Sequence, residues 1–99
     1  MRIRYTATAL REIDDILFYI AERNQTAAVA LRARVDKTVA ALLDFPDMAQ
    51  AADEPGVRRI PIGRSPYIIY YAVEGDEIVI LHARHGARRP LYEDKPYGS

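Results

Sequence analysis

The sequence predicts an α+β domain in which a helical hairpin packs on a small antiparallel sheet, in the order β-α-α-β-β-β. In the first half, apolar residues recur every three or four positions, as they do along amphipathic helices. The second half contains three runs rich in Ile, Val and Tyr, residues that suit half-buried strands. Only three or four residues separate these runs, and connections this short join antiparallel strands.

A short strand and a helix are predicted at the N-terminal end. Residues Arg2–Tyr5 alternate basic and apolar side chains, as a strand with one buried face would. Thr6 or Thr8 can cap the helix that follows, and Asn24 is expected to end it in a left-handed conformation. The apolar stripe of this helix consists of Leu10, Ile13, Ile16, Leu17 and Ile20.

A second helix is expected between Thr26, as its cap, and Phe45-Pro46, where proline stops it. Its apolar stripe consists of Ala28, Leu31, Val35, Val39, Leu42 and Leu43. Two helices of about seventeen residues with a connection of two or three residues have to lie antiparallel. Because each helix has one apolar stripe, the two should pack on each other and on the sheet.

Three further strands are predicted after a polar loop that runs from Asp47 to Gly56. These strands are Val57–Ile62, Tyr67–Val73 and Glu77–Arg84. The N-terminal strand has to join the sheet at an edge or beside Glu77–Arg84, and the sequence leaves this choice open.

Length and composition point to one small cytoplasmic domain. We expect residues 1–89 to form that domain and residues 90–99, which include two prolines, to form an irregular tail. No cysteine is present, so neither a disulfide framework nor a thiolate metal site is available. No run approaches the ~18 apolar residues of a membrane span, and charged residues come too early for a secretory signal. The formal net charge is zero, and nothing in the sequence predicts a cofactor.

Several motifs follow one another along the chain. The predicted helices carry Ala9-x-x-Glu12-Ile13-x-x-Ile16, Tyr19-Ile20, Ala27-Ala28 and Leu42-x-x-Phe45-Pro46. The predicted strands carry Gly56-Val57-Arg58-Arg59-Ile60, Tyr67-Ile68-Ile69-Tyr70-Tyr71 and Ile78-x-Ile80-Leu81-x-Ala83-x-His85-Gly86-x-Arg88. In this order and spacing, the pattern resembles the RelE/ParE superfamily of type II toxin–antitoxin toxins. The ending HGARR is more similar to the ParE branch than to the RelE branch.

The resemblance implies an antitoxin partner that wraps the toxin surface, together with one of two activities. ParE-like members inhibit DNA gyrase and carry no comparable nuclease residues, whereas RelE-like members cleave mRNA in the ribosome. Asp53-Glu54 stand where the RelE-like pattern has a basic residue. We therefore expect a ParE-like growth inhibitor that binds its target without turnover, with a RelE-like mRNA interferase as the alternative. A non-toxic RNA- or protein-binding module is a third interpretation.

Candidate functional residues concentrate near the end of the last predicted strand. Ribonucleolytic chemistry needs a base, an acid and a cation around the phosphate. For the interferase alternative, the residues that could supply these parts are Arg58, Arg84, His85, Arg88 and Tyr92. Arg84, Arg88 and Arg89 form the best candidate patch for a target or antitoxin, because side chains at a strand end are expected to be exposed. His82 and His85 should project to opposite faces of the strand, which disfavours a shared metal site.

An exposed apolar groove is also predicted. The helices and strands hold more apolar residues than they can hide, and large apolar patches usually mark interaction sites. The residues expected in this surplus are Leu17, Phe18, Leu31 and Ile69. We expect a segment of the antitoxin to fill the groove, as a helix or as an added strand. Tyr67, Tyr70 and Tyr71 fit a sheet core better than a base-stacking surface.

Overall fold

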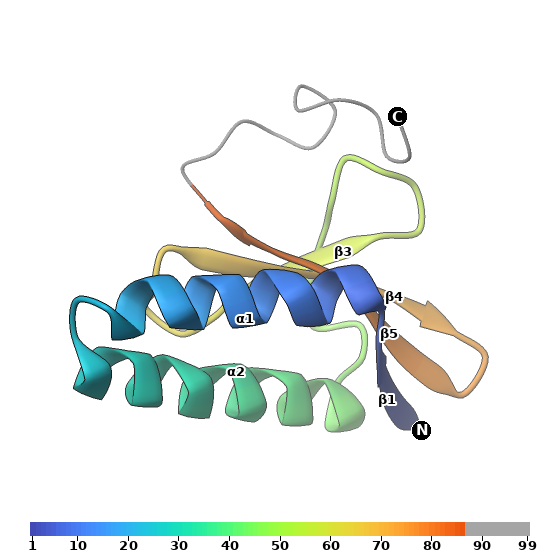
Figure 1. The fold of residues 1–99 in the computed structure, drawn as a ribbon. Helices are drawn as coiled ribbons and strands as arrows, with labels where there is room; N and C mark the ends of the chain where they lie inside the picture. Colours follow the sequence, from blue (N-terminus) through green and yellow to red (C-terminus); the bar gives the residue numbers. More distant parts are fainter. Residues whose placement is uncertain (87–99) are drawn as a thin grey trace.

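The computed structural model describes residues 1–86, which contain two helices and five strands (Figure 1). The elements follow each other as β1 (Arg2–Tyr5), α1 (Ala7–Ala21), α2 (Gln25–Asp44), β2 (Gln50–Ala51), β3 (Arg58–Pro61), β4 (Tyr67–Glu74) and β5 (Glu77–His85). The predicted α+β fold and its helical hairpin are confirmed. Within this part of the chain, the sequence missed β2, a two-residue strand inside the predicted loop.

The five strands form one sheet in the order β1-β5-β4-β3-β2, and this sheet is mixed rather than antiparallel. The β2-β3, β3-β4 and β4-β5 pairs are antiparallel, as predicted for the last three strands. β1 lies at one edge and pairs in parallel with β5, from Arg2 opposite Glu77 to Tyr5 opposite Ile80. The chain passes through both helices before it reaches the other strands, and a long crossover of this kind permits parallel pairing.

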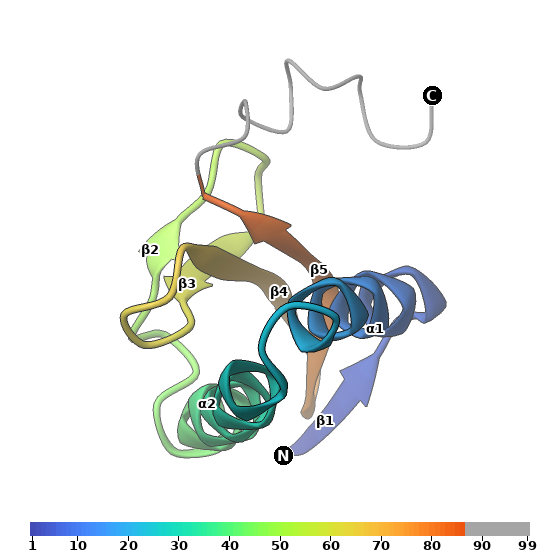
Figure 2. The same cartoon turned by 60° about the vertical axis from the view of Figure 1, so that its left-hand side comes forward.

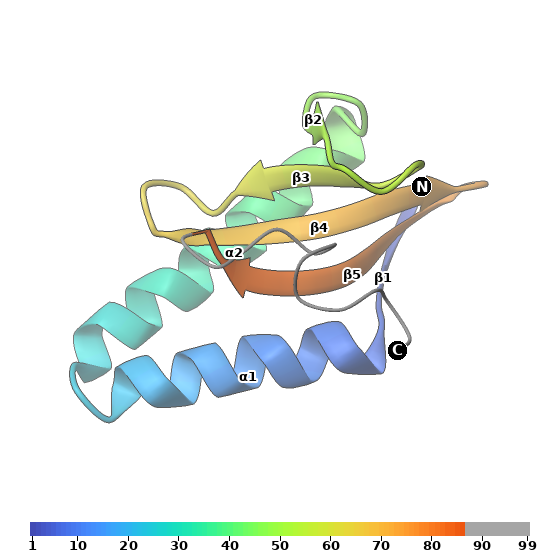
Figure 3. The same cartoon turned by 90° about the horizontal axis from the view of Figure 1, so that it is seen from above.

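Both helices cover the same face of the sheet, and no helix of residues 1–86 covers the other face (Figures 1 and 2). Figure 3 shows α1 along the β5 side of the sheet and α2 beneath β3 and β4. The hydrophobic core lies between the two layers. Its fully buried side chains include Leu42, Ile62, Ile69, Tyr71, Ile78 and Ile80. Neither helix is long and apolar enough to cross a membrane, as far as residues 1–86 are concerned.

A β-bulge determines which side chains of β5 face the helices. The pairing with β4 shifts between Tyr70 and Tyr71, and Leu81 is the extra residue of β5. Tyr71 is fully buried and marks the helix-covered face of β4. His82 pairs with Tyr70 and therefore lies on the outer face, whereas His85 lies on the helix-covered face. The predicted opposite orientation of the two histidines is confirmed.

The helix caps agree with the sequence for α1 and differ for α2. Thr6 caps α1, because its Oγ1 accepts a hydrogen bond from the N–H of Ala9 at 3.0 Å. Asn24, and not Thr26, caps α2 through a 3.0 Å hydrogen bond from the N–H of Ala27 to Oδ1. The φ of Asn24 is −159°, so the predicted left-handed conformation is wrong. An N-cap side chain requires an extended backbone, and this role excludes the left-handed one.

Candidate functional site

Beyond the end of β1, Thr6 and the first turns of α1 contact the edge of β5. Where the parallel pairing ends, the N–H of Thr6 donates to the carbonyl of Ile80 at 3.1 Å. The Thr6 hydroxyl donates to the next carbonyl, that of Leu81, at 3.3 Å. Further along the strand, Oε1 of Glu12 accepts from the N–H of Ala83 at 3.1 Å. The side chains of the cap residue Thr6 and of Glu12 in α1 therefore satisfy backbone groups that a neighbouring strand would otherwise satisfy.

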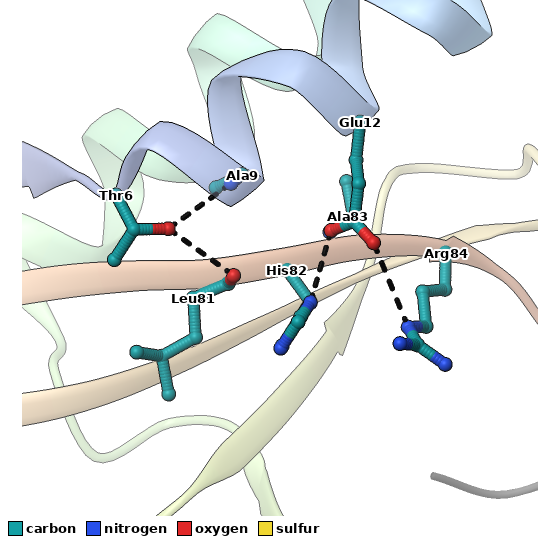
Figure 4. Close-up of polar contacts among 7 residues, drawn as sticks. All are labelled: Thr6, Ala9, Glu12, Leu81, His82, Ala83 and Arg84. Carbon is teal, nitrogen blue, oxygen red and sulfur yellow. Dashed lines mark hydrogen bonds and ion pairs between the residues drawn. The ribbon is translucent and has the colours of Figure 1, made fainter. Parts of the chain in front are cut away.

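Glu12 is the centre of a polar cluster at this edge. Its Oε1 lies 3.0 Å from Nδ1 of His82, and its Oε2 lies 3.8 Å from Nε of Arg84. The side chains of Glu12, His82 and Arg84 are 25%, 13% and 24% exposed. Figure 4 shows the carboxylate pointing from α1 towards β5, between the two basic side chains. Because electrostatic attraction is stronger at such partly buried positions than in bulk water, Glu12 holds both side chains in place.

A pocket of about 770 Å³ opens between α1 and the end of β5. Its lining combines acidic, aromatic, apolar and basic side chains: Glu12, Asp15, Ile16, Tyr19, Tyr67, Ala83, Arg84 and His85. The ring of His85 stands edge-on to that of Tyr67, with centroids 5.3 Å apart and an interplanar angle of 80°. Within residues 1–86, no group of three or more His, Cys, Asp or Glu side chains could hold a metal ion. The pocket can instead accept a group that forms hydrogen bonds and ring contacts together.

The structure brings two of the sequence-predicted candidates, Arg84 and His85, into the lining of this pocket. The expectation that Arg84 is exposed is wrong, because its side chain is largely covered and lies beside Glu12. α1 passes over the end of β5, and this packing could not be read from the strand sequence alone. Arg88, Arg89 and Tyr92 lie outside the described residues.

Arg58 lies away from the pocket. Its Nη1 donates to the carbonyl of Ala49 at 2.8 Å, and its Nη2 lies 3.7 Å from a carboxylate oxygen of Asp47. The sheet register separates Arg58 from Arg84 by two strand spacings and three residues along the strands. These offsets put the two backbones about 14 Å apart. The structure therefore does not bring Arg58 together with Arg84 and His85, the other candidates among residues 1–86.

The predicted apolar groove is corrected in part. Leu31 is 4% exposed and Ile69 is fully buried, so neither can line an exposed groove. Both belong to the core between the helices and the sheet, because Leu31 lies on the stripe that α2 turns inward. Leu17 is half-buried and packs against the same core. Phe18 is 67% exposed, and of the four residues it alone is largely accessible to solvent.

Glu12 stands within one of the helix motifs of the sequence, but no role was predicted for it. Tyr19 and Asp15 were also missed as lining residues of the pocket. A signal for Glu12 was present, because it lies three residues after Ala9 and four before Ile16, on the side of α1 that carries buried residues. An acid at such a position needs a polar partner, and here the partners are supplied by β5.

Comparison with known proteins identifies the family. A family model described as "ParE toxin of type II toxin-antitoxin system, parDE" matches residues 3–90. The chain belongs to the ParE toxin family. This ParE-family chain is 33% identical over 84 residues to a protein of Sinorhizobium fredii named "Putative toxin Y4kP". The match covers 83% of the chain and 88% of that protein.

Solved structures show the same fold as this ParE-family toxin. A chain of the chromosomal ParDE TA system from P. aeruginosa has a TM-score of 0.76 at 23% identity, and the match covers 86% of this chain and 95% of that one. The isolated RelE toxin of E. coli has a TM-score of 0.62 at 17% identity, with 93% and 90% covered. Since both branches of the superfamily share the fold, the fold alone does not choose between their activities.

Proposed function

We propose that this ParE-family chain inhibits growth by binding a target such as DNA gyrase in the cytoplasm, and that it does not cut RNA. A cognate antitoxin is its proposed partner and neutralises it. The match to the ParE toxin family supports the ParE-like choice. The likeness to a chain of a ParDE toxin-antitoxin system supports the antitoxin partner.

One observation carries the choice of binding over RNA cleavage: among the candidates within residues 1–86, Arg58 lies away from the pocket that Arg84 and His85 line. Cleavage of RNA requires a base, a cation and an acid around one phosphate. Arg58 binds the carbonyl of Ala49, and its backbone lies about 14 Å from that of Arg84. Arg84 and His85 belong to opposite faces of β5. Among the described residues, these three side chains do not surround a common point.

The charge of the pocket beside β5 also supports a protein target. Glu12 and Asp15 contribute two carboxylates to its lining, next to Arg84 and His85. A carboxylate repels the phosphate of an RNA substrate and its transition state. A protein surface can satisfy the acidic, basic and aromatic groups of this pocket together, since protein interfaces combine arginine, aromatic and hydrogen-bonding contacts.

A RelE-like interferase is the second candidate, and one observation favours it. His85 and Tyr67 stand ring against ring in a pocket that Arg84 also lines. A histidine and a tyrosine can transfer protons, and an arginine can neutralise a phosphate. In this alternative a phosphate competes with the nearby carboxylate of Glu12 for the guanidinium of Arg84.

A direct comparison of the two activities tests the proposal. The purified protein is added to a gyrase supercoiling assay, and mRNA from induced cells is mapped by primer extension on translated messages. We expect supercoiling to be inhibited, DNA synthesis to stop before protein synthesis, and no new mRNA ends to form. New ends in the ribosomal A site that disappear in His85→Ala, with gyrase unaffected, would overturn the proposal.

Paired variants connect the activity to the pocket. Arg84→Ala should weaken growth inhibition, because it removes the cation that Glu12 holds beside the pocket. Arg11→Ala is the matched control, since Arg11 is exposed on α1 and does not line the pocket. Melting curves of both variants establish that each is folded. Equal loss of growth inhibition in the two folded variants would show that the pocket is not the target-binding surface.

A further inference from the structure

A second pocket, of about 500 Å³, lies between α2 and the turn that joins β3 to β4. Its lining residues are Arg34, Lys37, Thr38, Ala41, Met48, Ile60, Pro61, Gly63 and Arg64. None of them lines the pocket beside Glu12. We name this surface the α2–turn groove.

One wall of the groove is a single face of α2. Arg34, Lys37, Thr38 and Ala41 follow the spacing i, i+3, i+4, i+7, which places their side chains in a row along the helix. Both basic residues are exposed, and the other two are half-buried. The buried stripe of the helix faces the core instead, so this row is available to a partner.

The opposite wall is the turn, and Gly63 allows it to approach the helix. Its φ of +57° lies in the left-handed region, which glycine adopts without the strain of a side chain. A Cβ at this position would lie 3.3 Å from Cδ of Arg34, so the stem of Arg34 rests against the turn. Arg64, the next residue of the turn, contributes a second guanidinium to the same groove.

Of the residues that the structure describes, three cations and no acid line the groove. Within residues 1–86, the structure records no ion pair and no side-chain hydrogen bond for Arg34, Lys37 or Arg64. Nearby on α2, by contrast, Arg32 is paired with Asp36 at 3.5 Å. A cluster of like charges without acidic neighbours creates a positive potential and attracts an anionic group.

Apart from Thr38, the remaining lining is apolar and not aromatic among the described residues, and this decides the chemical class of the partner. Met48 is 47% exposed, Pro61 is exposed and Ile60 is half-buried. Single-stranded nucleic acids bind through aromatic side chains on which bases stack, and no aromatic residue within positions 1–86 lines this groove. Aliphatic side chains of a protein segment would bury apolar surface against Met48 and Ile60, which is favourable. A phosphate backbone has no apolar surface to bury there.

We propose that the α2–turn groove binds a segment of a partner protein in which acidic side chains stand beside aliphatic ones. The carboxylates pair with Arg34, Lys37 and Arg64, and arginine forks can hold them through two hydrogen bonds. The aliphatic side chains cover Met48 and Ile60. This inference does not depend on the target proposed above, because the groove uses none of the residues beside Glu12.

Fluorescence anisotropy with a synthetic peptide of glutamate and leucine tests the proposal. The matched probes are a peptide of glutamate and serine and an oligothymidylate. We expect the glutamate–leucine peptide to bind most tightly, and Arg34→Gln/Lys37→Gln/Arg64→Gln to weaken it by about tenfold or more. The control Arg2→Gln/Arg4→Gln/Arg11→Gln removes the same charge from β1 and α1, and its affinity should stay within about twofold of the unmodified protein.

Amide chemical shifts give the location of binding without a substitution. Titration of the unmodified protein with the glutamate–leucine peptide should shift Thr38, Ala41 and Gly63 more than residues beside Glu12. Met48→Ser should lower the affinity for this peptide and leave the affinity for the glutamate–serine peptide unchanged. Tighter binding of oligothymidylate, if lost in the groove variant, would identify a nucleic-acid site and overturn the proposal. Equal losses in groove and control variants would overturn it as well.

Discussion

Nδ1 of His82 lies 3.0 Å from Oε1 of Glu12, and this contact joins β5 to α1 across 70 residues of sequence. The same oxygen accepts a hydrogen bond from the N–H of Ala83 at 3.1 Å. Because the carboxylate accepts from both groups, Nδ1 of His82 is the nitrogen that donates. One side chain thus fixes the helix, the strand edge and the imidazole, at the place where β1 no longer covers β5.

Replacement of Glu12 should reduce stability in a graded way. Glu12→Ala removes the acceptor of Ala83 and leaves a partly covered N–H without its partner, which costs about 1–3 kcal/mol. Glu12→Gln keeps an oxygen acceptor for this N–H and should therefore lose clearly less stability than Glu12→Ala. Urea unfolding followed by circular dichroism measures both. Equal losses in the two variants would show that the negative charge, and not the acceptor, is what stabilises this edge.

The two helix caps can be compared by a pair of substitutions close in sequence. Asn24→Ala should cost about 1 kcal/mol, because Oδ1 no longer accepts from the N–H of Ala27. Thr26→Ala, the matched control inside α2, should change stability by less than about 0.5 kcal/mol. Thermal unfolding of both variants is the measurement. A larger loss for Thr26→Ala would contradict the cap seen in the structure.

Local patterns predicted the two helices, the last three antiparallel strands and the fold class, because apolar periodicity and connection length are read over a few residues. The spacing that includes Val35 and Val39 identified the buried face of α2. The cap of α2 was missed because Asn24 and Thr26 can both cap a helix, and only the short connection after α1 selects the first. The edge position of β1 depends on packing between distant segments, for which the sequence gives no local signal.

The candidate site was less predictable than the fold for the same reason. Arg84 and His85 were singled out by type and position, but their surroundings depend on a bulge at Leu81 and on the path of α1. Glu12 acquires its role only when the helix lies across β5. A residue 70 positions from its partner cannot be assigned that partner by spacing along one element. The hydrogen bond from Arg58 to the carbonyl of Ala49 could not be predicted for the same reason.

Tyr71 should make stability depend on alkaline pH. Burial raises the pKa of its hydroxyl above the ordinary value of 10.0, and the hydroxyl donates to the carbonyl of Pro46 at 2.8 Å. Its contribution is present below pH about 10 and is lost as pH rises through the higher folded-state pKa, because the unfolded chain ionises first. Tyr71→Phe should cost about 1 kcal/mol at neutral pH and reduce this alkaline loss.

Urea unfolding across this pH range tests the prediction for Tyr71. Burial also raises the pKa of Tyr5, so Tyr71→Phe should keep part of the alkaline dependence. Tyr5→Phe is the comparison variant, and the double variant should show the weakest dependence on pH. An unchanged pH profile in Tyr71→Phe would show that its hydroxyl ionises equally easily in the folded and unfolded chain.

Leu31 and Phe18 should separate stability from partner binding. Leu31→Ala should cost about 2–5 kcal/mol, because it leaves a cavity in the core between α2 and the sheet. Phe18→Ser alters a side chain that is 67% exposed and should change stability by less than about 0.5 kcal/mol. If the antitoxin covers α1, Phe18→Ser should weaken its binding in a titration calorimeter. Unchanged affinity would place Phe18 outside the antitoxin interface.

Arg58 should prove to be a structural residue. Its guanidinium donates to the carbonyl of Ala49 at 2.8 Å and pairs with Asp47, so it fixes the chain between α2 and β2 against β3. Hydrogen bonds that involve a charged group contribute about 1.5–3 kcal/mol, and partial exposure brings the expected cost of Arg58→Ala towards the lower end. Arg58→Lys keeps the charge but loses the forked guanidinium, so its stability should lie between those of the unmodified protein and Arg58→Ala. Growth inhibition should decline only in proportion to the folded protein, measured by soluble yield and melting temperature in the same cells. A stable Arg58→Ala variant without growth inhibition would instead place Arg58 in contact with the target, and would revive the RNA-cleavage alternative.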